Sequence, residues 1–536
     1  MRHQLLFLLL LASLSLVESH TTIDAASRYR QARYIRTTQG HETAQPLWKD
    51  LLDEFPSDRT AATHIASSRD SSRHQDRLIE CQDRDCQQRV IQLLRESNYN
   101  PQAIADCIFG DDQAKTKTVL NSCAPLYLSP LAAGATCPPL PTSRLSCWMQ
   151  LLLMSVCLPL DCWLQHFTRQ DFELCESMGL LFAENDFVIP LCHVMPVALY
   201  NHAASPKILY VATDLHPRAL NTIHVGTNQD GAVMYLGPDS LALVHHYSAQ
   251  LQHGQHASIL DLGTGSGIQA LIAQATTQAP HVTCVDVNRR ALLLAKLNFE
   301  WNRQDDESLH LDLVLGDLRE DQGHQRLMMV DAVNGITTLS ITLESWSELL
   351  VPPTLMLSNP PFLPVPDDDA VIHNRHGWFS GGGPSGEDLL QIVVELSSAI
   401  LPEHGTLAIV SEFMNPHLVG KRIQEWWGRG CSDSEVVTAA ATGVLFTNQV
   451  PIDASTYAQR RADTSDEEDI WKQHLEREGI THISPGLLFL RKSAEGGTLQ
   501  LQQELVPKTT QGSIWTPTNQ EAVDFTRDHL RQVLED

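Results

Sequence analysis

The sequence predicts a protein whose larger part is an α/β domain with a mainly parallel sheet, preceded by a smaller α+β domain. Two observations lead to this fold class. Beyond about residue 233, short apolar runs typical of buried strands alternate with segments of helical periodicity. A glycine-rich turn also separates the first of these strands from the helix after it. Such an alternation is typical of a parallel sheet with helices on both faces.

The elements of the larger domain follow one another with few breaks. The predicted strands are apolar runs bounded by turn residues, at 258–262, 281–286, 311–316, 354–358, 406–411 and 480–492. The predicted helices have apolar residues at helical spacing, one beginning near residue 268 and two others at 290–298 and 388–400. A charged helical insertion is expected at 464–478, and the helix predicted at 519–534 is expected to be a surface appendage.

The smaller domain is predicted over residues 78–232. Helix-compatible clusters at 87–94, 116–120 and 148–158 precede predicted strands at 187–191 and 208–212. The rest of the chain divides by composition into four parts: a targeting segment at 1–19, a polar linker or transit-like segment at 20–77, the larger domain at 233–500, and a tail with a helix at 501–536. No internal repeat is present in the sequence.

Composition narrows the classes of function. Of the 536 residues, 43% are apolar and 19% are charged, which is ordinary for a globular protein and excludes a wholly disordered or collagen-like chain. The 38 Lys and Arg against 64 Asp and Glu give a net charge of −26. Since phosphate contacts need clustered cations, this charge argues against broad, non-specific nucleic-acid binding and leaves only a local basic groove open.

The N-terminus predicts a targeting segment. Residues 5–17 form a mainly apolar run that suits a signal peptide, with a cut after Ser19, and is shorter than the roughly 20 residues of a membrane span. Residues 20–39 carry four arginines and one acid, as a transit peptide or a solvated linker does. We therefore expect the secretory pathway or two-step organellar targeting, with a cytoplasmic protein as the alternative. The 12 cysteines leave the compartment open.

The sharpest local signal is the glycine-rich turn from Asp261 to Gly267, with the sequence DLGTGSG. Glycines let a backbone turn tightly and approach a ligand, and the start of the next helix supplies free N–H donors. A dinucleotide-binding G-x-G-x-x-G pattern would need glycine in place of Ile268. The turn resembles instead the D-x-G-x-G-x-G loop of class I S-adenosylmethionine methyltransferases, which implies a Rossmann-like, mainly parallel sheet of seven strands.

Two carboxylates fit the order of elements in that fold. Asp286 ends the second predicted strand, 19 residues beyond Gly267, where a carboxylate can bind both ribose hydroxyls. Asp317 ends the third predicted strand, and in the family this position lies beside the adenine. For each, a solvated turn carboxylate is the alternative. The resemblance implies S-adenosyl-L-methionine as the cofactor, with its methionine pocket formed by Asp261, Gly263, Gly265 and Gly267.

The segment Asn359-Pro360-Pro361-Phe362 follows the fourth predicted strand. It resembles the N-P-P-[YF] motif of methyltransferases that act on a planar nitrogen. The lone pair of such a nitrogen is delocalised, so the atom is a poor nucleophile and has to be positioned. The Asn359 side-chain oxygen and the Pro360 carbonyl can hold its two N–H bonds, and Phe362 can stack on the planar group. The predicted catalytic residues are therefore Asn359, Pro360 and Phe362.

Two flanking segments narrow the resemblance. Residues 235–244 resemble the P-R-P-[DE]-T-E-x-L-V segment of the protein-glutamine N-methyltransferases that modify release factors, with Gly237 and Leu241 in place of arginine and glutamate. Residues 381–389 resemble the same enzymes' G-G-x-D-G-L-D loop, with Ser385 in place of the first aspartate. The layout is also similar to a bacterial family of two-domain "small-domain" methyltransferases.

The resemblance implies an N-methyltransferase with a macromolecular acceptor. A protein glutamine is the expected acceptor, an RNA base with an exocyclic amine is the alternative, and a non-catalytic cofactor-binding scaffold is the alternative of another class. We expect no extended nucleic-acid surface, no membrane span beyond the N-terminal segment and no metal. His245 and His246 lack metal-site spacing and are expected on the surface or in a helix, and Trp426 and Trp427 are expected to pack a helix onto the sheet.

Overall fold

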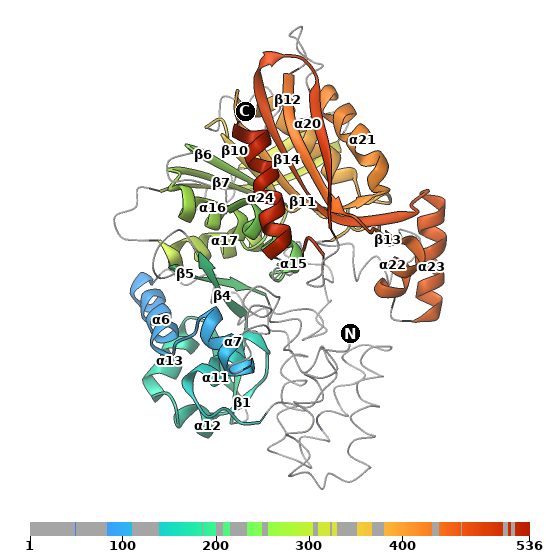
Figure 1. The fold of residues 1–536 in the computed structure, drawn as a ribbon. Helices are drawn as coiled ribbons and strands as arrows, with labels where there is room; N and C mark the ends of the chain where they lie inside the picture. The colour runs from blue at the N-terminus through green and yellow to red at the C-terminus, as the bar shows by residue number, and fades with distance from the viewer. Residues whose placement is uncertain are drawn as a thin grey trace. The chain divides into compact units, whose positions relative to one another are not determined.

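The chain forms two compact units, Met1–Ala198 with Ile208–Gly226 and Leu199–Lys207 with Thr227–Asp536 (Figure 1). The computed structural model describes residue 49 and residues 83–109, 139–184, 186–199, 207–214, 233–248, 256–303, 309–321, 324–329, 351–366, 380–430, 439–462, 464–507, 513–515 and 520–535. The predicted targeting segment, nearly all of the linker and the helix predicted at 116–120 lie outside the described residues.

The first unit contains short helices and two small sheets. Its helical elements are α6 (Arg84–Glu96), α7 (Pro101–Phe109), α11 (Arg144–Trp148), the π-helix η2 (Met149–Leu153), α12 (Leu160–Leu164) and α13 (Arg169–Ser177). One antiparallel sheet has the order β1-β3-β2, formed by β1 (Leu158–Pro159), β2 (Leu181–Glu184) and β3 (Phe187–Pro190). The other pairs β4 (His193–Leu199) with β5 (Lys207–Thr213).

Aromatic side chains form much of the core of this unit. Trp163 is fully buried, with its ring stacked on Phe167 at 4.1 Å and edge-on to Trp148 at 5.1 Å between centroids. The helix predicted at 148–158 is wrong at its end, because the helical backbone stops at Leu153 and Leu158 pairs with Val188 as a strand. The local sequence is apolar throughout, so helical spacing alone did not show where the chain turns into the sheet.

The second unit is built on one large sheet. Its strands are β6 (Ser258–Leu262), β7 (His281–Asp286), β8 (His310–Asp321), β9 (His324–Met329), β10 (Leu355–Ser358), β11 (Thr406–Met414), β12 (Ala439–Asn448), β13 (Ile452–Asp453), β14 (His482–Gly496) and β15 (Leu499–Val506). Their order is β15-β12-β14-β11-β10-β6-β7-β8-β9, with β13 paired to β14. The predicted α/β class is confirmed, and the predictions for β6 and β7 match residue for residue.

The expected number of seven strands is too small, because the described residues alone place ten strands in this sheet. The five strands β8, β7, β6, β10 and β11 are mutually parallel, and β14 runs antiparallel between β11 and β12. The additional strands are β9, which forms an antiparallel hairpin with β8, and β13 and β15, which pair with β14 and β12. The fold class is unaffected because all three are added around the parallel centre.

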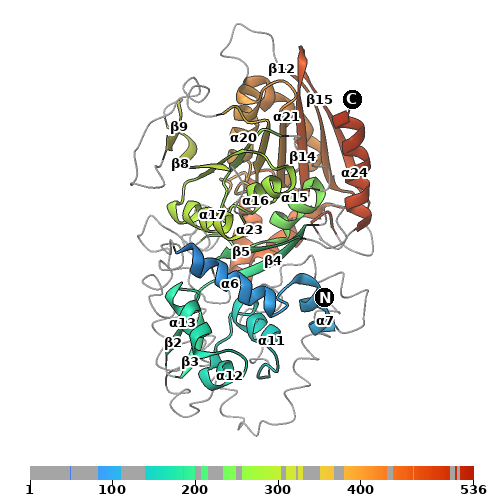
Figure 2. The ribbon, with the colours of Figure 1, turned by 90° about the vertical axis from the view of Figure 1, so that its left-hand side faces the viewer.

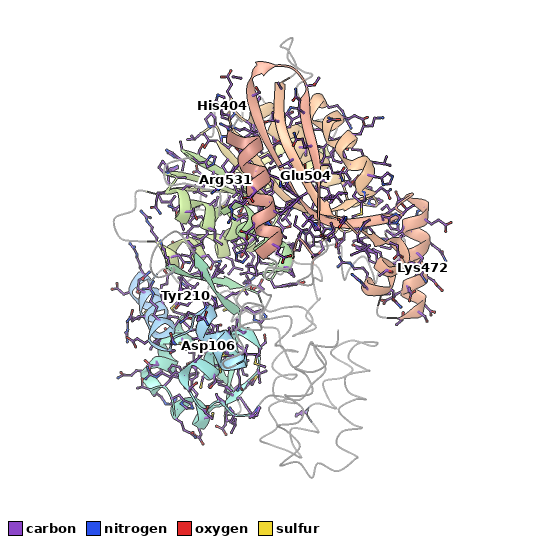
Figure 3. All side chains as sticks on the ribbon, in the orientation of Figure 1. Asp106, Tyr210, His404, Lys472, Glu504 and Arg531 are labelled. Carbon is purple, nitrogen blue, oxygen red and sulfur yellow. The ribbon has the colours of Figure 1, made fainter. Side chains whose placement is uncertain are left out.

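Helices cover both faces of this sheet (Figures 1 and 2). One face is covered by α15 (Pro238–Ser248), α16 (Ile268–Thr277), α17 (Arg289–Asn302) and α24 (Gln520–Glu535), which contact one another in the order α24, α15, α16, α17. The other face is covered by α20 (Asp388–Ile400) and α21 (Pro416–Arg429). The charged insertion predicted at 464–478 forms α23 (Ser465–Arg477), which carries Lys472 (Figure 3), and α22 (Ala454–Arg461) precedes it. Lys472 pairs with Glu468 at 2.6 Å.

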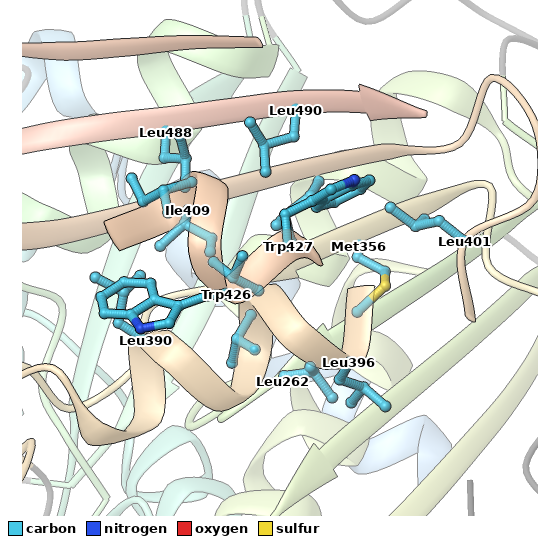
Figure 4. Close-up of a cluster of buried hydrophobic side chains, with 14 of the residues drawn as sticks. Leu262, Met356, Leu390, Leu396, Leu401, Ile409, Trp426, Trp427, Leu488 and Leu490 are labelled. Carbon is cyan, nitrogen blue, oxygen red and sulfur yellow. The ribbon is translucent and has the colours of Figure 1, made fainter. Parts of the chain in front are cut away.

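The core under α20 and α21 is dense and almost wholly apolar (Figure 4). Trp426 and Trp427, 4% and 1% exposed, pack from α21 against side chains of the sheet such as Ile409 and Leu488. This confirms the prediction that the tryptophan pair packs a helix onto the sheet. Each fully buried side chain of this size contributes roughly 1.5–3 kcal/mol, so this face holds the strand ends firmly.

The C-terminal helix α24 is not the surface appendage that we expected. Ala522, Thr526 and Leu530 are each at most 1% exposed, and α24 contacts β12, β15 and α15. The buried His246 of α15 contacts α24 through Nδ1, 2.7 Å from Thr526 Oγ1, and its Nε2 lies 2.9 Å from the carbonyl of Ile514, which precedes α24 in the chain. The expectation of a helix position for His246 is confirmed and that of a surface position is wrong, since the apolar face of α24 covers it.

His246→Ala is expected to lower the free energy of unfolding by about 1–3 kcal/mol, because it leaves the Ile514 carbonyl without this donor. Burial lowers the pKa of His246 from 6.5 to about 4. The unfolded wild-type chain therefore binds a proton below pH 6.5 that the folded chain excludes, and the wild type loses stability as the pH falls toward 4. The effect of the substitution should be largest above pH 6.5 and shrink below it, as measured by urea denaturation.

The matched control is His417→Ala, which removes an exposed histidine from α21. It should change the free energy of unfolding by less than about 0.5 kcal/mol at either pH. Equal effects of the two substitutions would show that His246 does not hold α15 to α24.

Candidate cofactor and acceptor site

The candidate site lies at the carboxyl edge of the parallel strands. The strand order changes direction at β6, because the chain adds β7 and β8 on one side and then returns to place β10 on the other. Leu262 pairs with Ser358 and with Val285, so the loops after β6, β7 and β10 start side by side. Loops that part at such a switch point leave a crevice, which is where open α/β sheets bind ligands.

The glycine-rich turn has the backbone that its sequence predicts. Gly263, Gly265 and Gly267 have φ values of 70°, 53° and 78°, in the region that favours glycine. A Cβ at Gly267 would lie 2.8 Å from the Cβ of Ala295, so this glycine also lets α17 pack closely. A Cβ at Gly265 would meet nothing within 4 Å, so the turn has open space there that a ligand can occupy.

Asp261 lies completely buried at the end of β6. Its Oδ2 accepts hydrogen bonds from Thr264 Oγ1 at 2.7 Å and from the Ala270 backbone N–H at 3.4 Å. Its Oδ1 has no partner among the described residues. Burial raises the pKa of Asp261 to about 7, the Thr264 and Ala270 hydrogen bonds act against this rise, and the charge of Asp286 adds to it. A buried carboxylate with one free oxygen suits a cationic donor such as the ammonium group of a bound methionine moiety.

Asp286 ends β7 and holds the glycine-rich turn. Its Oδ2 accepts from the Gly265 backbone N–H and its Oδ1 from the Asn288 backbone N–H, each at 2.8 Å. These bonds fix the carboxylate and leave further lone pairs on both oxygens, as two ribose hydroxyls would require. Burial raises the pKa of Asp286, and the two backbone hydrogen bonds act in the opposite direction.

Asp317 does not end its strand, as we expected, because β8 continues to Asp321. The parallel pairing of β8 with β7 stops where Leu315 lies opposite Asp286, and Asp317 pairs with Arg326 of the β9 hairpin. The backbone of Asp317 thus lies just beyond the parallel edge, while its side chain is outside the described residues. The adenine role of Asp317 stays a prediction.

Asn359 follows β10 directly. Its backbone lies next to the glycine-rich turn, since a Cβ at Gly263 would lie 3.9 Å from the Asn359 backbone carbonyl oxygen. Its Nδ2 donates to Asp239 Oδ2 at 2.7 Å and lies 3.3 Å from Ser240 Oγ. Its Oδ1 is buried without a hydrogen-bond partner among the described residues. This is the oxygen that the sequence predicts to accept from the reacting nitrogen.

Pro360 and Phe362 lie in a loop that the second glycine-rich segment supports. Leu363 bridges to Gly381, and a Cβ at Gly382 would lie 2.7 Å from the Pro361 carbonyl oxygen, so the two loops are in direct contact. Pro360 is buried, and no described residue donates a hydrogen bond to its carbonyl. The Phe362 ring is 9% exposed and lies 5.4 Å from the Trp515 ring. Its proposed stacking on the acceptor stays a prediction.

Two features of the site were missed in the sequence. Asp239 lies in a segment that we compared with a known family, but no role followed from its sequence. Glu412 near the end of β11 accepts from Tyr457 Oη at 2.5 Å and from Arg461 Nη2 at 2.8 Å, which ties helix α22 to this edge. These contacts have no local signal in the sequence. Asp239 lies 120 residues from its partner Asn359, and Glu412 lies 45 and 49 residues from Tyr457 and Arg461.

Comparison with known proteins agrees with the cofactor half of this geometry. Residues 241–332 match the family described as ribosomal protein L11 methyltransferase (PrmA). The matched region contains Asp261, the glycine-rich turn and Asp286. The second unit is an S-adenosylmethionine-dependent methyltransferase. The match covers less than a fifth of the methyltransferase chain and stops before Asn359, so it does not identify the acceptor.

Solved structures similar to this methyltransferase include a predicted O-methyltransferase, Atu636, from Agrobacterium tumefaciens, with 14% identity over 53% of this chain and 95% of that one and a TM-score of 0.28. A methyltransferase from Pyrococcus furiosus has 15% identity over 48% of this chain and 84% of that chain, with a TM-score of 0.23. A putative RNA methyltransferase from Pyrococcus horikoshii has 14% identity over 48% of this chain and 84% of that chain, with a TM-score of 0.23. At these scores the likenesses carry no argument about the acceptor. No protein of curated function matches the sequence.

The described part of the methyltransferase chain contains neither a candidate membrane span nor a cluster of candidate metal ligands. None of its helices is both long and apolar enough to cross a bilayer. Its described His, Cys, Asp and Glu side chains form no group of three or more that could hold a metal ion.

Gly265→Ala is expected to weaken S-adenosylmethionine binding at least tenfold, because the methyl group would fill the open space of the turn. Gly479→Ala is the matched control, since Gly479 also has a positive φ of 66° with nothing within 4 Å of its Cβ but lies at the far end of α23. Both substitutions should cost about 1–2 kcal/mol of stability through backbone strain. Calorimetric titration should show weakened binding for Gly265→Ala alone. Equal affinities of the two variants would show that S-adenosylmethionine does not bind at the glycine-rich turn.

Asp286→Ala is expected to weaken S-adenosylmethionine binding by roughly 1–3 kcal/mol, because two hydroxyl acceptors and the anchor of Gly265 are lost together. Asp286→Asn keeps one acceptor oxygen, so its affinity for S-adenosylmethionine should lie between those of the wild type and Asp286→Ala. Asp528→Ala removes an exposed carboxylate of α24 and should leave the dissociation constant unchanged. An unchanged constant for Asp286→Ala would reduce this residue to a turn carboxylate.

Proposed function

We propose that the methyltransferase unit transfers a methyl group to the side-chain amide nitrogen of a protein glutamine. The observation that carries this proposal is the oriented Asn359 amide: its Oδ1 is buried without a hydrogen-bond partner among the described residues, and the backbone of Asn359 lies next to the glycine-rich turn. An unsatisfied buried acceptor costs about 1–3 kcal/mol, so a site that retains one is suited to a ligand with a matching donor. A non-catalytic scaffold has no need of such a group.

The residues at the end of β10 fit a planar NH2 group better than other groups that could receive a methyl. Asn359 Oδ1 and the Pro360 carbonyl are both hydrogen-bond acceptors, and an amide or aromatic NH2 presents two N–H donors in one plane. Holding both N–H bonds fixes the nitrogen in position and in orientation, which supplies much of the catalysis for a poor nucleophile. When bound, S-adenosylmethionine supplies an electrophilic methyl group on a sulfonium.

The charges at this edge favour a peptide over RNA. Asp239, Asp261, Asp286 and Glu412 all lie within the site or beside it, and Arg461, which contacts this edge, is paired with Glu412. None of these carboxyl groups can bind a phosphate backbone, and those that are ionised repel it, whereas a glutamine side chain is neutral. The net charge of −26 acts in the same direction. An RNA base with an exocyclic amine uses the same two acceptors and is the alternative that the test has to separate.

The test is transfer of a labelled methyl group to three probes. We expect a peptide with a central glutamine to be labelled, and neither the same peptide with glutamate at that position nor an oligoribonucleotide with unpaired adenosines. Labelling of the RNA alone would overturn the glutamine proposal and keep the N-methyltransferase. Absence of labelling on all three, with cofactor binding intact, would overturn both acceptors.

Asn359→Ala is expected to reduce transfer by roughly 10²-fold or more, because the reacting nitrogen loses one of its two contacts. Its affinity for S-adenosylmethionine should stay within about twofold in calorimetric titration, since its side chain is assigned to the acceptor. Asn302→Ala on α17, where the amide Nδ2 donates to the Asn298 carbonyl of the same helix, is the control and should leave both values unchanged. A large loss of cofactor affinity in Asn359→Ala would contradict the acceptor role.

A further inference from the structure

Asp239 makes the closest contact to the proposed acceptor-binding amide. It lies in the first turn of α15, is 4% exposed, and places Oδ2 2.7 Å from Asn359 Nδ2. This distance is typical of a hydrogen bond to a charged acceptor, which is about twice as strong as one between neutral groups. Asp239 reaches Asn359 from 120 residues earlier in the chain, so the contact depends on the packing of α15 beside the sheet.

The chemistry of a carboxylate decides how the Asn359 amide is turned. An ionised carboxylate only accepts hydrogen bonds, so the part of the amide that faces Asp239 has to be the NH2 group. Ser240 Oγ, 3.3 Å from the same nitrogen, offers an acceptor for the second hydrogen. Both amide hydrogens are therefore directed at α15, and Oδ1 is left facing away from these acceptors. If the amide turned over, Oδ1 would meet a carboxylate oxygen and be repelled.

The space beside Gly237 gives independent support for the contact between Asp239 and Asn359. A Cβ at Gly237 would lie 2.0 Å from Asp239 Oδ1 and 3.1 Å from its Cγ, which no neighbouring carboxylate in this rotamer could tolerate. The φ of Gly237 is not in the left-handed region, so glycine is needed there for space and not for backbone conformation. Gly237 thus leaves room for the side-chain conformation in which Asp239 reaches Asn359.

We propose that Asp239 is a positioning residue, which acts through Asn359 by holding the amide with Oδ1 toward the acceptor nitrogen. This inference rests on the proposed function of Asn359. Asp239 has no assigned contact with the cofactor or the acceptor, so its removal should change the rate of transfer and not the affinity for S-adenosylmethionine. Gly237 contributes by leaving the space that the carboxylate occupies.

The test uses the full chain and the probe that the wild type methylates. Asp239→Ala should lower kcat at least tenfold, because the amide is then free to turn over, with cofactor affinity within about twofold. Asp239→Asn can still present one oxygen to Asn359 and should recover part of the loss. Gly237→Ala keeps the carboxylate but displaces it, and should lower kcat as Asp239→Ala does. Ser240→Ala, which removes only the longer contact, should lose less than either.

A double-mutant cycle separates positioning from a structural role. If Asp239 acts only through Asn359, adding Asp239→Ala to Asn359→Ala should change the residual rate by less than about twofold. Equal effects of Asp239→Ala in both backgrounds, or a parallel loss of cofactor affinity, would overturn the inference and leave Asp239 as a residue that merely stabilises α15.

A spectroscopic measurement keeps the inference testable if the wild type methylates no probe, an outcome that would count against the proposed acceptors only. In protein labelled with nitrogen-15 at asparagine, the side-chain NH2 signal lost in Asn359→Ala identifies Asn359. We expect slow hydrogen exchange of this NH2 group in the wild type and in Ser240→Ala, and fast exchange in Asp239→Ala and Gly237→Ala. Exchange unchanged in Asp239→Ala would show that the carboxylate does not hold the amide.

Discussion

The methyltransferase unit depends on one topological constraint, the reversal of strand order at β6. Because β7 and β10 flank β6 on opposite sides, the loops after β6 and β10 part from one another at the edge of the sheet. The first loop carries the glycine-rich turn and the second carries Asn359, and their backbones approach each other at Gly263. The buried apolar layers beneath α20 and α21 fix the strand ends, and so they also fix the separation of the two halves of the site.

Buried carboxylates are concentrated at this edge, and each is stabilised in a different way. Asp286 is held by backbone N–H groups, Asp239 by the Asn359 amide, and Glu412 by Tyr457 and Arg461. Asp261 keeps one oxygen free, as Asn359 keeps its carbonyl oxygen free. The described side-chain acceptors of this edge without a partner are thus the two atoms to which the cofactor and the acceptor nitrogen are assigned, which is where unsatisfied polar groups are expected in an unliganded binding site.

The sequence predicted the parts of the fold that have local signals. Apolar runs located β6 and β7 to the residue, and the glycine-rich turn located the cofactor end of the site, because strand burial and positive φ both restrict residue type. The continuation of β8 beyond Asp317 was not predicted, since a charged hairpin carries no apolar period. The docking of α24 and the contact of Asp239 with Asn359 were also missed, because both depend on packing between distant segments.

The link between α15 and α24 has a consequence for the order in which the molecule is completed. The helix that begins with Asp239 is held near its other end by His246, whose partners are Ile514 and Thr526. During synthesis on a ribosome, the glycine-rich turn and the Asn359 loop emerge long before those partners do. The acceptor half of the site therefore reaches its final geometry only after the chain has been made as far as Thr526, so nascent chains that stop before Ile514 would hold the cofactor loop without a finished place for the methyl acceptor.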